Sequence, residues 1–290
     1  VVGVLNHDFS HPLFDRREVH DIYREWRKVF NEYNPPRFAV AEAWVVPEHQ
    51  HLYASMDELG QSFNFDFAQA NWYADEFRKA IAAGLKAAAE TGGSTTTWVM
   101  NNHDVPRSPS RYGLPQVKGA PYHQLPHDWL LRNGTTYPED RELGTRRARA
   151  AALMELGLPG AAYIYQGEEL GMTNPHFTEI DQYRDVESLN YYKILREQGK
   201  SEAETLNILA KRSRDDGRTP MQWDSSPNAG FTSGTPWIGV ADNYKSINAA
   251  AQTSDADSIY SFYKAMVRLR KEHRVISEGK IEFLYPDNTD

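Results

Sequence analysis

The chain has 290 residues, of which 40% are hydrophobic and 25% are charged, a balance typical of globular proteins with a buried core. Its formal net charge of −8 argues against binding to nucleic acid, because such proteins need a basic surface to displace counterions from phosphates. There is no cysteine, which excludes disulfides, thiolate nucleophiles and cysteine-ligated zinc. Cysteine-free chains are consistent with a reducing compartment, so we expect a cytoplasmic protein. No apolar run approaches the roughly 18 residues of a membrane span, and we expect no membrane contact.

A short apolar strand, a polar loop and an amphipathic helix recur along the chain. Residues 18–33 place apolar side chains at spacings of three and four, which predicts a helix that Pro35 and Pro36 end. Ser201 and Glu204 form the pattern of a helix capping box. Further helices are expected at 73–90, 142–156 and 258–273, and strands at 38–41, 63–67, 95–100 and 161–165. This alternation predicts an α/β fold with a parallel sheet and helices packed outside it.

Four strand–helix units are half of a TIM (β/α)8-type barrel, the commonest closed α/β barrel. The fourth unit is followed by a long polar excursion at about 172–257. After the last helix, residues 281–285 have the pattern of one more strand. No Gly-x-Gly-x-x-Gly motif follows any strand, which disfavours a dinucleotide-binding fold.

Acidic residues follow three of the four predicted strands. Glu42 follows the first strand, Asp104 follows the third, and Glu168 and Glu169 follow the fourth. Catalytic groups of barrels gather at the carboxyl ends of the strands, and a carboxylate at the end of an apolar strand is expected to be partly desolvated. Desolvation raises the pKa of a carboxyl group and suits it to donate a proton. Taken singly, each acid is as well explained by a loop contact with water or an arginine.

Four segments, in order along the chain, form a more specific pattern. They are residues 37–44 (RFAVAEAW), 98–107 (WVMNNHDVPR), 162–172 (AYIYQGEELGM) and 213–223 (SRDDGRTPMQW). Together they resemble the α-amylase superfamily of glycoside hydrolases and, within it, the α-glucosidase and oligo-1,6-glucosidase branch. The resemblance runs collinearly over essentially the whole chain.

The resemblance implies a role for each matching residue. Glu42 corresponds to the general acid/base, and Asp104 to the carboxylate that stabilises the transition state. His103 corresponds to a histidine that hydrogen-bonds the sugar, and Arg218 to an arginine that clamps the terminal glucose. Glu168 is expected to be structural. The implied activity is retaining cleavage of terminal α-glucosidic bonds in small malto- or isomalto-oligosaccharides.

The family's nucleophile is absent from the sequence. It is an aspartate in a Gly-Phe-Arg-x-Asp type motif, and no such motif occurs here. The resemblance therefore implies that residues 1–275 correspond to about strands five to eight of the barrel, and that 276–290 begin a C-terminal β domain. We expect the nucleophile to lie upstream and the isolated chain to be inactive.

The resemblance implies a small oligosaccharide as ligand, no cofactor and no required metal. A half barrel would leave its first and last strands unpaired, so we expect association with a second copy or with the missing half. Two alternatives remain open. One is a trehalose synthase-like isomerase or transglycosylase, and the other is a non-catalytic sugar-binding or structural fragment.

Overall fold

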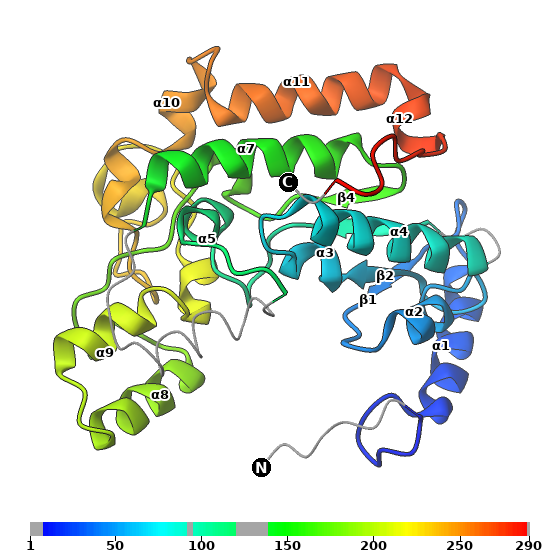
Figure 1. Cartoon of the computed structure of the whole chain (residues 1–290), viewed down its shortest axis with the longest axis horizontal. Coiled ribbons are helices and arrows are strands. Elements are labelled where there is room, and N and C mark those ends of the chain that lie inside the picture. Colours follow the sequence, from blue (N-terminus) through cyan, green and yellow to red (C-terminus); the bar gives the residue numbers. More distant parts are fainter. Residues whose placement is uncertain (1–7, 92–94, 120–138, 289–290) are drawn as a thin grey trace.

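The computed structural model describes residues 8–91, 95–119 and 139–288. Its centre is a four-stranded parallel sheet in the order β1–β2–β3–β4 (Figure 1). The strands are β1 Ala39–Ala41, β2 Gly60–Asn64, β3 Thr97–Val99 and β4 Ala161–Tyr163. The predicted α/β class, the parallel pairing and the four strands in chain order are confirmed.

Helices alternate with these strands. The α-helices are α1 Arg17–Phe30, α2 Pro47–Tyr53, α3 Phe65–Gln69, α4 Ala74–Glu90, α5 Ser108–Gly113, α7 Arg141–Gly157, α8 Val186–Glu197, α9 Glu202–Leu209, α10 Ala249–Thr253, α11 Ile259–Glu272 and α12 Arg274–Glu278. Short 3-10 turns are η1 Glu168–Leu170, η2 Ile180–Gln182, η3 Arg214–Arg218, η4 Pro227–Gly230 and η5 Asp242–Lys245. The capping box expected at Ser201 and Glu204 is formed and starts α9, as predicted.

The main core lies between the sheet and its helices. Trp98 on β3 is fully buried and packs with Phe67 and Phe77, which come from α3 and α4. On the other side of α7, a second cluster joins Leu156 to Met266 of α11. Figure 1 shows α11 running alongside α7 as an outer layer, with the α8–α9 pair set apart from α1 and α2.

The second strand starts earlier than the sequence predicted. It ends at Asn64, and Phe65–Gln69 form α3 instead of continuing the strand. The Asn64 side chain accepts a hydrogen bond from the backbone N–H of Phe67 at 3.1 Å and caps the helix. The alternating phenylalanines suggested a strand, but a local cap decides the backbone conformation here.

The sequence predicted no helix between residues 100 and 142, yet Ser108–Gly113 form the buried helix α5. Residues 120–138 lie outside the described residues. Helix α5 packs tightly on α7 at Gly144, where a Cβ atom would lie 1.9 Å from the carbonyl oxygen of Pro109. A glycine at this position therefore permits the close approach of the two helices.

The prediction of a strand at residues 281–285 is wrong, since this segment has no strand structure. Ile281 and Phe283 instead pack against the main core. Arg78 on α4 donates hydrogen bonds to the carbonyl oxygens of Pro286 and Asn288, both at 2.7 Å. These apolar side chains are thus partly buried against the main core without joining the sheet. A C-terminal β domain at 276–290 stays a prediction.

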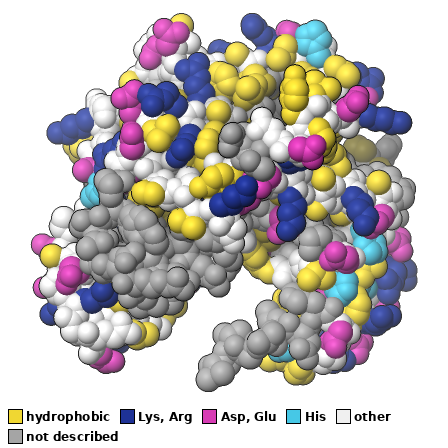
Figure 2. Space-filling view, viewed as in Figure 1, with side chains coloured by type: hydrophobic (Ala, Val, Ile, Leu, Met, Phe, Trp, Pro, Cys, Tyr) yellow, Lys and Arg dark blue, Asp and Glu magenta, His cyan; other side chains and the backbone are white. Residues whose placement is uncertain are grey.

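None of the described helices combines the length and the apolar character needed to cross a lipid bilayer. On the face shown in Figure 2, lysine and arginine side chains are interspersed with aspartate and glutamate.

Candidate active site

Glu42, His103 and Asp104 come together at the carboxyl ends of the strands. Glu42 directly follows β1, and the other two residues lie in the loop after β3. One potential ligand atom of each side chain lies within 4.8 Å of the other two. Strand β2 lies between β1 and β3, so these side chains converge across an intervening strand. The three residues singled out from separate motifs therefore share one site.

Two asparagines shape the loop that carries His103 and Asp104. The Asn102 side chain accepts hydrogen bonds from the backbone N–H groups of Asp104 at 2.8 Å and Val105 at 3.0 Å. The buried Asn101 side chain accepts from the backbone N–H of Ser108 at 2.9 Å and from its hydroxyl at 2.6 Å. Asparagine often stabilises such turns through its own side chain. The two asparagines were visible in the sequence, but this role was not anticipated.

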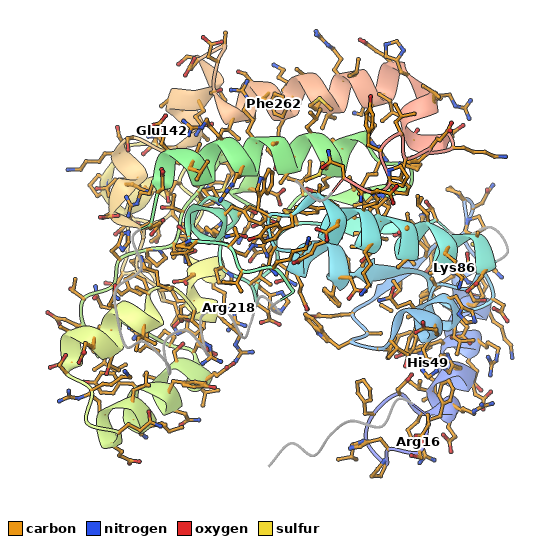
Figure 3. All side chains as sticks on the ribbon, viewed as in Figure 1. Arg16, His49, Lys86, Glu142, Arg218 and Phe262 are labelled. Atoms are coloured by element: carbon orange, nitrogen blue, oxygen red, sulfur yellow. The ribbon has the colours of Figure 1, made fainter. Side chains whose placement is uncertain are left out.

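Arg218 is brought to the same place from a distant part of the chain. Its Nη2 donates to Asp104 Oδ1 at 2.8 Å, and its Nε donates to the carbonyl oxygen of His103 at 2.9 Å. Figure 3 labels Arg218 between the α8–α9 pair and the strand-bearing part of the molecule. All four residues predicted for the site are therefore adjacent in the structure.

Arg214, which was not predicted, also faces Asp104. Its Nη1 lies 3.6 Å from Asp104 Oδ1. Its Nε and Nη2 donate to Asp185 Oδ1 at 3.0 and 2.5 Å. Burial works to raise the pKa of Asp185, but bonds from Arg214 and Ser188 outweigh it and hold the pKa below its ordinary value.

A fully buried arginine, Arg107, joins the loops around the site. Its Nη1 donates to the carbonyl oxygen of Gln166 at 3.0 Å, and its Nε to that of Asp216 at 3.0 Å. Its Nη2 donates to the Thr219 hydroxyl at 3.1 Å. Burial lowers the pKa of Arg107 to about 10, although nearby negative charges oppose this. Arg107 thus ties the loop after β3 to the loop after β4 and to η3.

Glu168 has the structural surroundings that the sequence suggested. Its Oε1 accepts a hydrogen bond from the hydroxyl of Tyr263 on α11 at 2.7 Å. The fully buried Glu155 on α7 also faces Glu168. Burial, first, and then the charge of Glu168 raise the pKa of Glu155 well above its ordinary value. The bond from Tyr263 to Glu168 therefore links α11 to η1.

One expectation about Glu42 is wrong. Its side chain was expected to be partly desolvated at the end of an apolar strand, but Glu42 is exposed. The reason is that Glu42 directly follows β1, an outer strand that pairs only with β2 within the described part of the chain. The burial that this acid was expected to have is therefore not supplied by the described residues.

The charges around Asp104 indicate the kind of ligand that fits. Glu42, His103 and Asp104 offer donor atoms of the types that metal ions use. However, guanidinium groups of Arg218 and Arg214 lie 2.8 and 3.6 Å from the Asp104 carboxylate, and their charge opposes a cation there. The charges of the two arginines therefore disfavour a metal ion at this cluster.

Comparison with known families agrees with this geometry. Residues 5–279 match the family model for the alpha amylase catalytic domain. Because the match covers most of the chain, this protein belongs to the α-amylase catalytic-domain family. The predicted superfamily is confirmed, and the family relationship implies a TIM-barrel type of α/β fold.

Individual relatives lie in the predicted branch. The trehalose-6-phosphate hydrolase of Escherichia coli (strain K12) is 37% identical over 252 residues, covering 83% of this chain and 41% of that protein. The oligo-1,6-glucosidase of Parageobacillus thermoglucosidasius is 34% identical over 286 residues, covering 93% and 46%. Among solved structures, Bacillus licheniformis trehalose-6-phosphate hydrolase gives a TM-score of 0.75 at 37% identity, covering 94% of this chain and 47% of that one. The chain spans less than half the length of each of these relatives.

Proposed function

We propose that this chain forms part of a retaining glycoside hydrolase that cleaves terminal α-glucosidic bonds of small malto- or isomalto-oligosaccharides. The observation that supports the proposal is the convergence of Glu42, His103 and Asp104 within 4.8 Å at the carboxyl ends of β1 and β3. Family membership and the printed functions of the relatives agree with it. The chain would correspond to about strands five to eight of the barrel.

In this proposal each residue acts through its own chemistry. Glu42 protonates the leaving glycosidic oxygen and then, as a carboxylate, takes a proton from the attacking water. The transition state resembles an oxocarbenium ion, and the negative charge of Asp104 stabilises it. His103 hydrogen-bonds the glucose unit, and Arg218 orients both the Asp104 carboxylate and the sugar.

The nucleophile of the double displacement lies outside this sequence. We therefore expect the isolated chain to give no turnover of p-nitrophenyl α-glucoside, since no glycosyl-enzyme intermediate can form. The same chain is expected to bind isomaltose weakly, and calorimetry should show about tenfold weaker binding for D104N because a charged hydrogen-bond partner is lost.

The control for this experiment is E142Q, because Glu142 is exposed at the start of α7, and Figure 3 labels it apart from Arg218 of the site. This variant should bind isomaltose as the parent chain does. Robust turnover by the isolated chain would contradict the absence of the nucleophile. Equal loss of binding in D104N and E142Q would contradict the proposed site.

A second candidate substrate is trehalose 6-phosphate. The E. coli and B. subtilis trehalose-6-phosphate hydrolases are 37% and 34% identical to this chain, in the same range as the oligo-1,6-glucosidases. A trehalose synthase-like isomerase is the alternative within the same chemistry, because water and a sugar acceptor compete for one intermediate. Product analysis with isomaltose, maltose, sucrose and trehalose 6-phosphate, using a barrel that contains the nucleophile, separates these substrates and outcomes.

The open sheet suggests how the chain is completed. Within the described residues β1 pairs only with β2, and β4 only with β3, so each has one unpaired side. Exposed strand edges favour pairing with further strands. We expect sedimentation to show self-association at micromolar concentration, or a one-to-one complex when the upstream half of the barrel is supplied. A compact monomer under both conditions would contradict this expectation.

A further inference from the structure

Two adjacent aspartates of η3, Asp215 and Asp216, are fully buried but differ in their surroundings. Asp215 Oδ2 accepts hydrogen bonds from the backbone N–H groups of Arg184 at 2.7 Å and Asp185 at 3.0 Å. Asp215 Oδ1 and both side-chain oxygens of Asp216 have no hydrogen-bond partner among the described residues. Burying an ionised carboxylate without a donor costs far more than burying the neutral acid. The structure therefore accommodates Asp216 best with its proton bound.

Charged and titratable groups from four other segments act on this pair of acids. They are Lys211 after α9, Arg107 in the loop after β3, Glu139 before α7 and Tyr183 before α8. Lys211 Nζ bonds to Glu139 at 3.1 Å, and Arg107 Nε donates to the backbone carbonyl oxygen of Asp216. Burial, first, and then the charge of Asp215 raise the pKa of Asp216 well above its ordinary value of 3.8. The two cations oppose this shift without reversing it.

The turn that holds Asp216 also carries the arginine of the candidate site. Arg218 lies two residues further along and donates to Asp104 Oδ1 at 2.8 Å. The turn lies directly against the loop that carries Asp104, since a Cβ atom on Gly217 would come within 2.8 Å of the carbonyl oxygen of Asn102. A movement of Asp216 toward water therefore displaces Arg218 from Asp104.

We propose that Asp216 is a proton-dependent switch of η3, which keeps Arg218 on Asp104 while Asp216 is protonated and releases it when Asp216 ionises. The inference rests on the proposed function and adds regulation by pH to the same site. Ionisation places an unpaired carboxylate beside Asp215 in the interior. Water supplies the missing donors only if η3 moves outward.

The sign of the effect follows from the proton. The buried form of η3 binds one proton more than the outward form, so it is complete at low pH and is lost as the pH rises through the raised pKa of Asp216. Sugar binding requires the buried form. Above that pKa the affinity for isomaltose should therefore fall by up to tenfold per pH unit.

The first test measures isomaltose binding to the full chain by calorimetry at pH 6, 7, 8 and 9. D216N keeps the shape of the side chain but cannot ionise, so its affinity should equal that of the parent chain at pH 6 and lack the alkaline fall. The matched control is D242N, because Asp242 lies in another 3-10 turn, η5, and is exposed. D242N should lose affinity with pH as the parent chain does. Glu42, His103 and Asp104 are unchanged in all three proteins, so the comparison isolates Asp216.

Two further measurements do not depend on D216N binding sugar. The charge of Glu139 helps to raise the pKa of Asp216, so E139Q should move the fall in affinity to lower pH. Hydrogen exchange followed by mass spectrometry reports the opening of residues 213–219 without any ligand. At pH 9 this segment should exchange at least tenfold faster in the parent chain than in D216N, whereas α4 should exchange equally in both.

The outcomes separate this inference from the proposed function. Equal alkaline losses of affinity in the parent chain and D216N, or no alkaline loss in the parent chain, overturn the switch and leave the proposed function standing. Equal exchange of residues 213–219 in both proteins also overturns it. If the parent chain binds no isomaltose at any pH but its η3 opens and that of D216N does not, the proposed function fails while the switch is supported.

Discussion

Replacing Arg107 by methionine is expected to destabilise the folded chain by about 3 to 5 kcal/mol. The guanidinium of Arg107 is buried and donates to three carbonyl oxygens, those of Gln166 in the loop after β4 and of Asp216 and Gly217 in η3. Methionine fills most of the volume but leaves these carbonyl oxygens in the interior without a donor. Each unsatisfied buried acceptor costs about 1 to 3 kcal/mol. Urea denaturation followed by circular dichroism measures the loss.

Two variants make the Arg107 experiment specific. R107K retains a donor but not the fork, so it should recover only part of the stability. R146M removes an arginine that is 63% exposed and paired with an exposed glutamate, and it should change stability little. If R107M and R146M had the same urea midpoint, Arg107 would not hold these loops together. Sugar binding should be lost with R107M even below its unfolding transition, because η3 carries Arg218.

Neutralising Glu155 is expected to stabilise the chain at neutral and alkaline pH. Glu155 is fully buried, and burial together with Glu168 raises its pKa well above the ordinary value of 4.5. Both Glu155 oxygens are buried without a hydrogen-bond partner among the described residues, so the charged carboxylate is disfavoured there. In E155Q the side chain keeps nearly the same shape, is neutral and does not titrate.

The sign of the pH dependence follows from proton binding. Above about pH 4.5 the unfolded chain has lost the Glu155 proton while the folded chain retains it. The contribution of the Glu155 proton to the stability of the folded chain is therefore fully present below the pKa that Glu155 has in the unfolded chain. It is lost as the pH rises through the pKa that Glu155 has in the folded chain. Over this window the advantage of E155Q should grow by up to about 1.4 kcal/mol per pH unit.

Urea midpoints at pH 5, 6, 7 and 8 measure this difference. E142Q is the matched control, because Glu142 lies on the same helix and is 84% exposed. For E142Q, the urea midpoint should change with pH in the same way as for the parent chain. If the urea midpoint of E155Q also changed with pH as that of the parent chain does, Glu155 would not keep its proton in the folded state.

The sequence predicted much of the fold because periodic signals were strong. Helices α1, α4, α7 and α11 begin and end within a few residues of their predicted limits. The errors came from local side-chain effects. Asn64 ends a strand by capping a helix, and Ile281 and Phe283 pack against the main core without forming a strand.

The candidate site was predicted only in part. Sequence motifs identified four of its residues, because a motif can be recognised from residue types and spacing alone; these are Glu42, His103, Asp104 and Arg218. Arg107 and Arg214 lie within the same motifs, but their roles depend on which carbonyl oxygens and carboxylates surround them after folding. Glu42 is exposed because it follows β1, which pairs only with β2 among the described residues. Such properties are tertiary, and composition or spacing does not reveal them.

The bond between Arg218 and Asp104 joins residues 114 positions apart, and those of Arg107 to Thr219 span 112. Forming a contact between residues so far apart in the sequence closes a long loop, and the loss of chain entropy opposes it until other contacts have formed. We therefore expect these contacts to form after the local helices and the neighbouring strands. Partly folded forms of this chain are then expected to retain helical content while the bond between Arg218 and Asp104 is not yet formed.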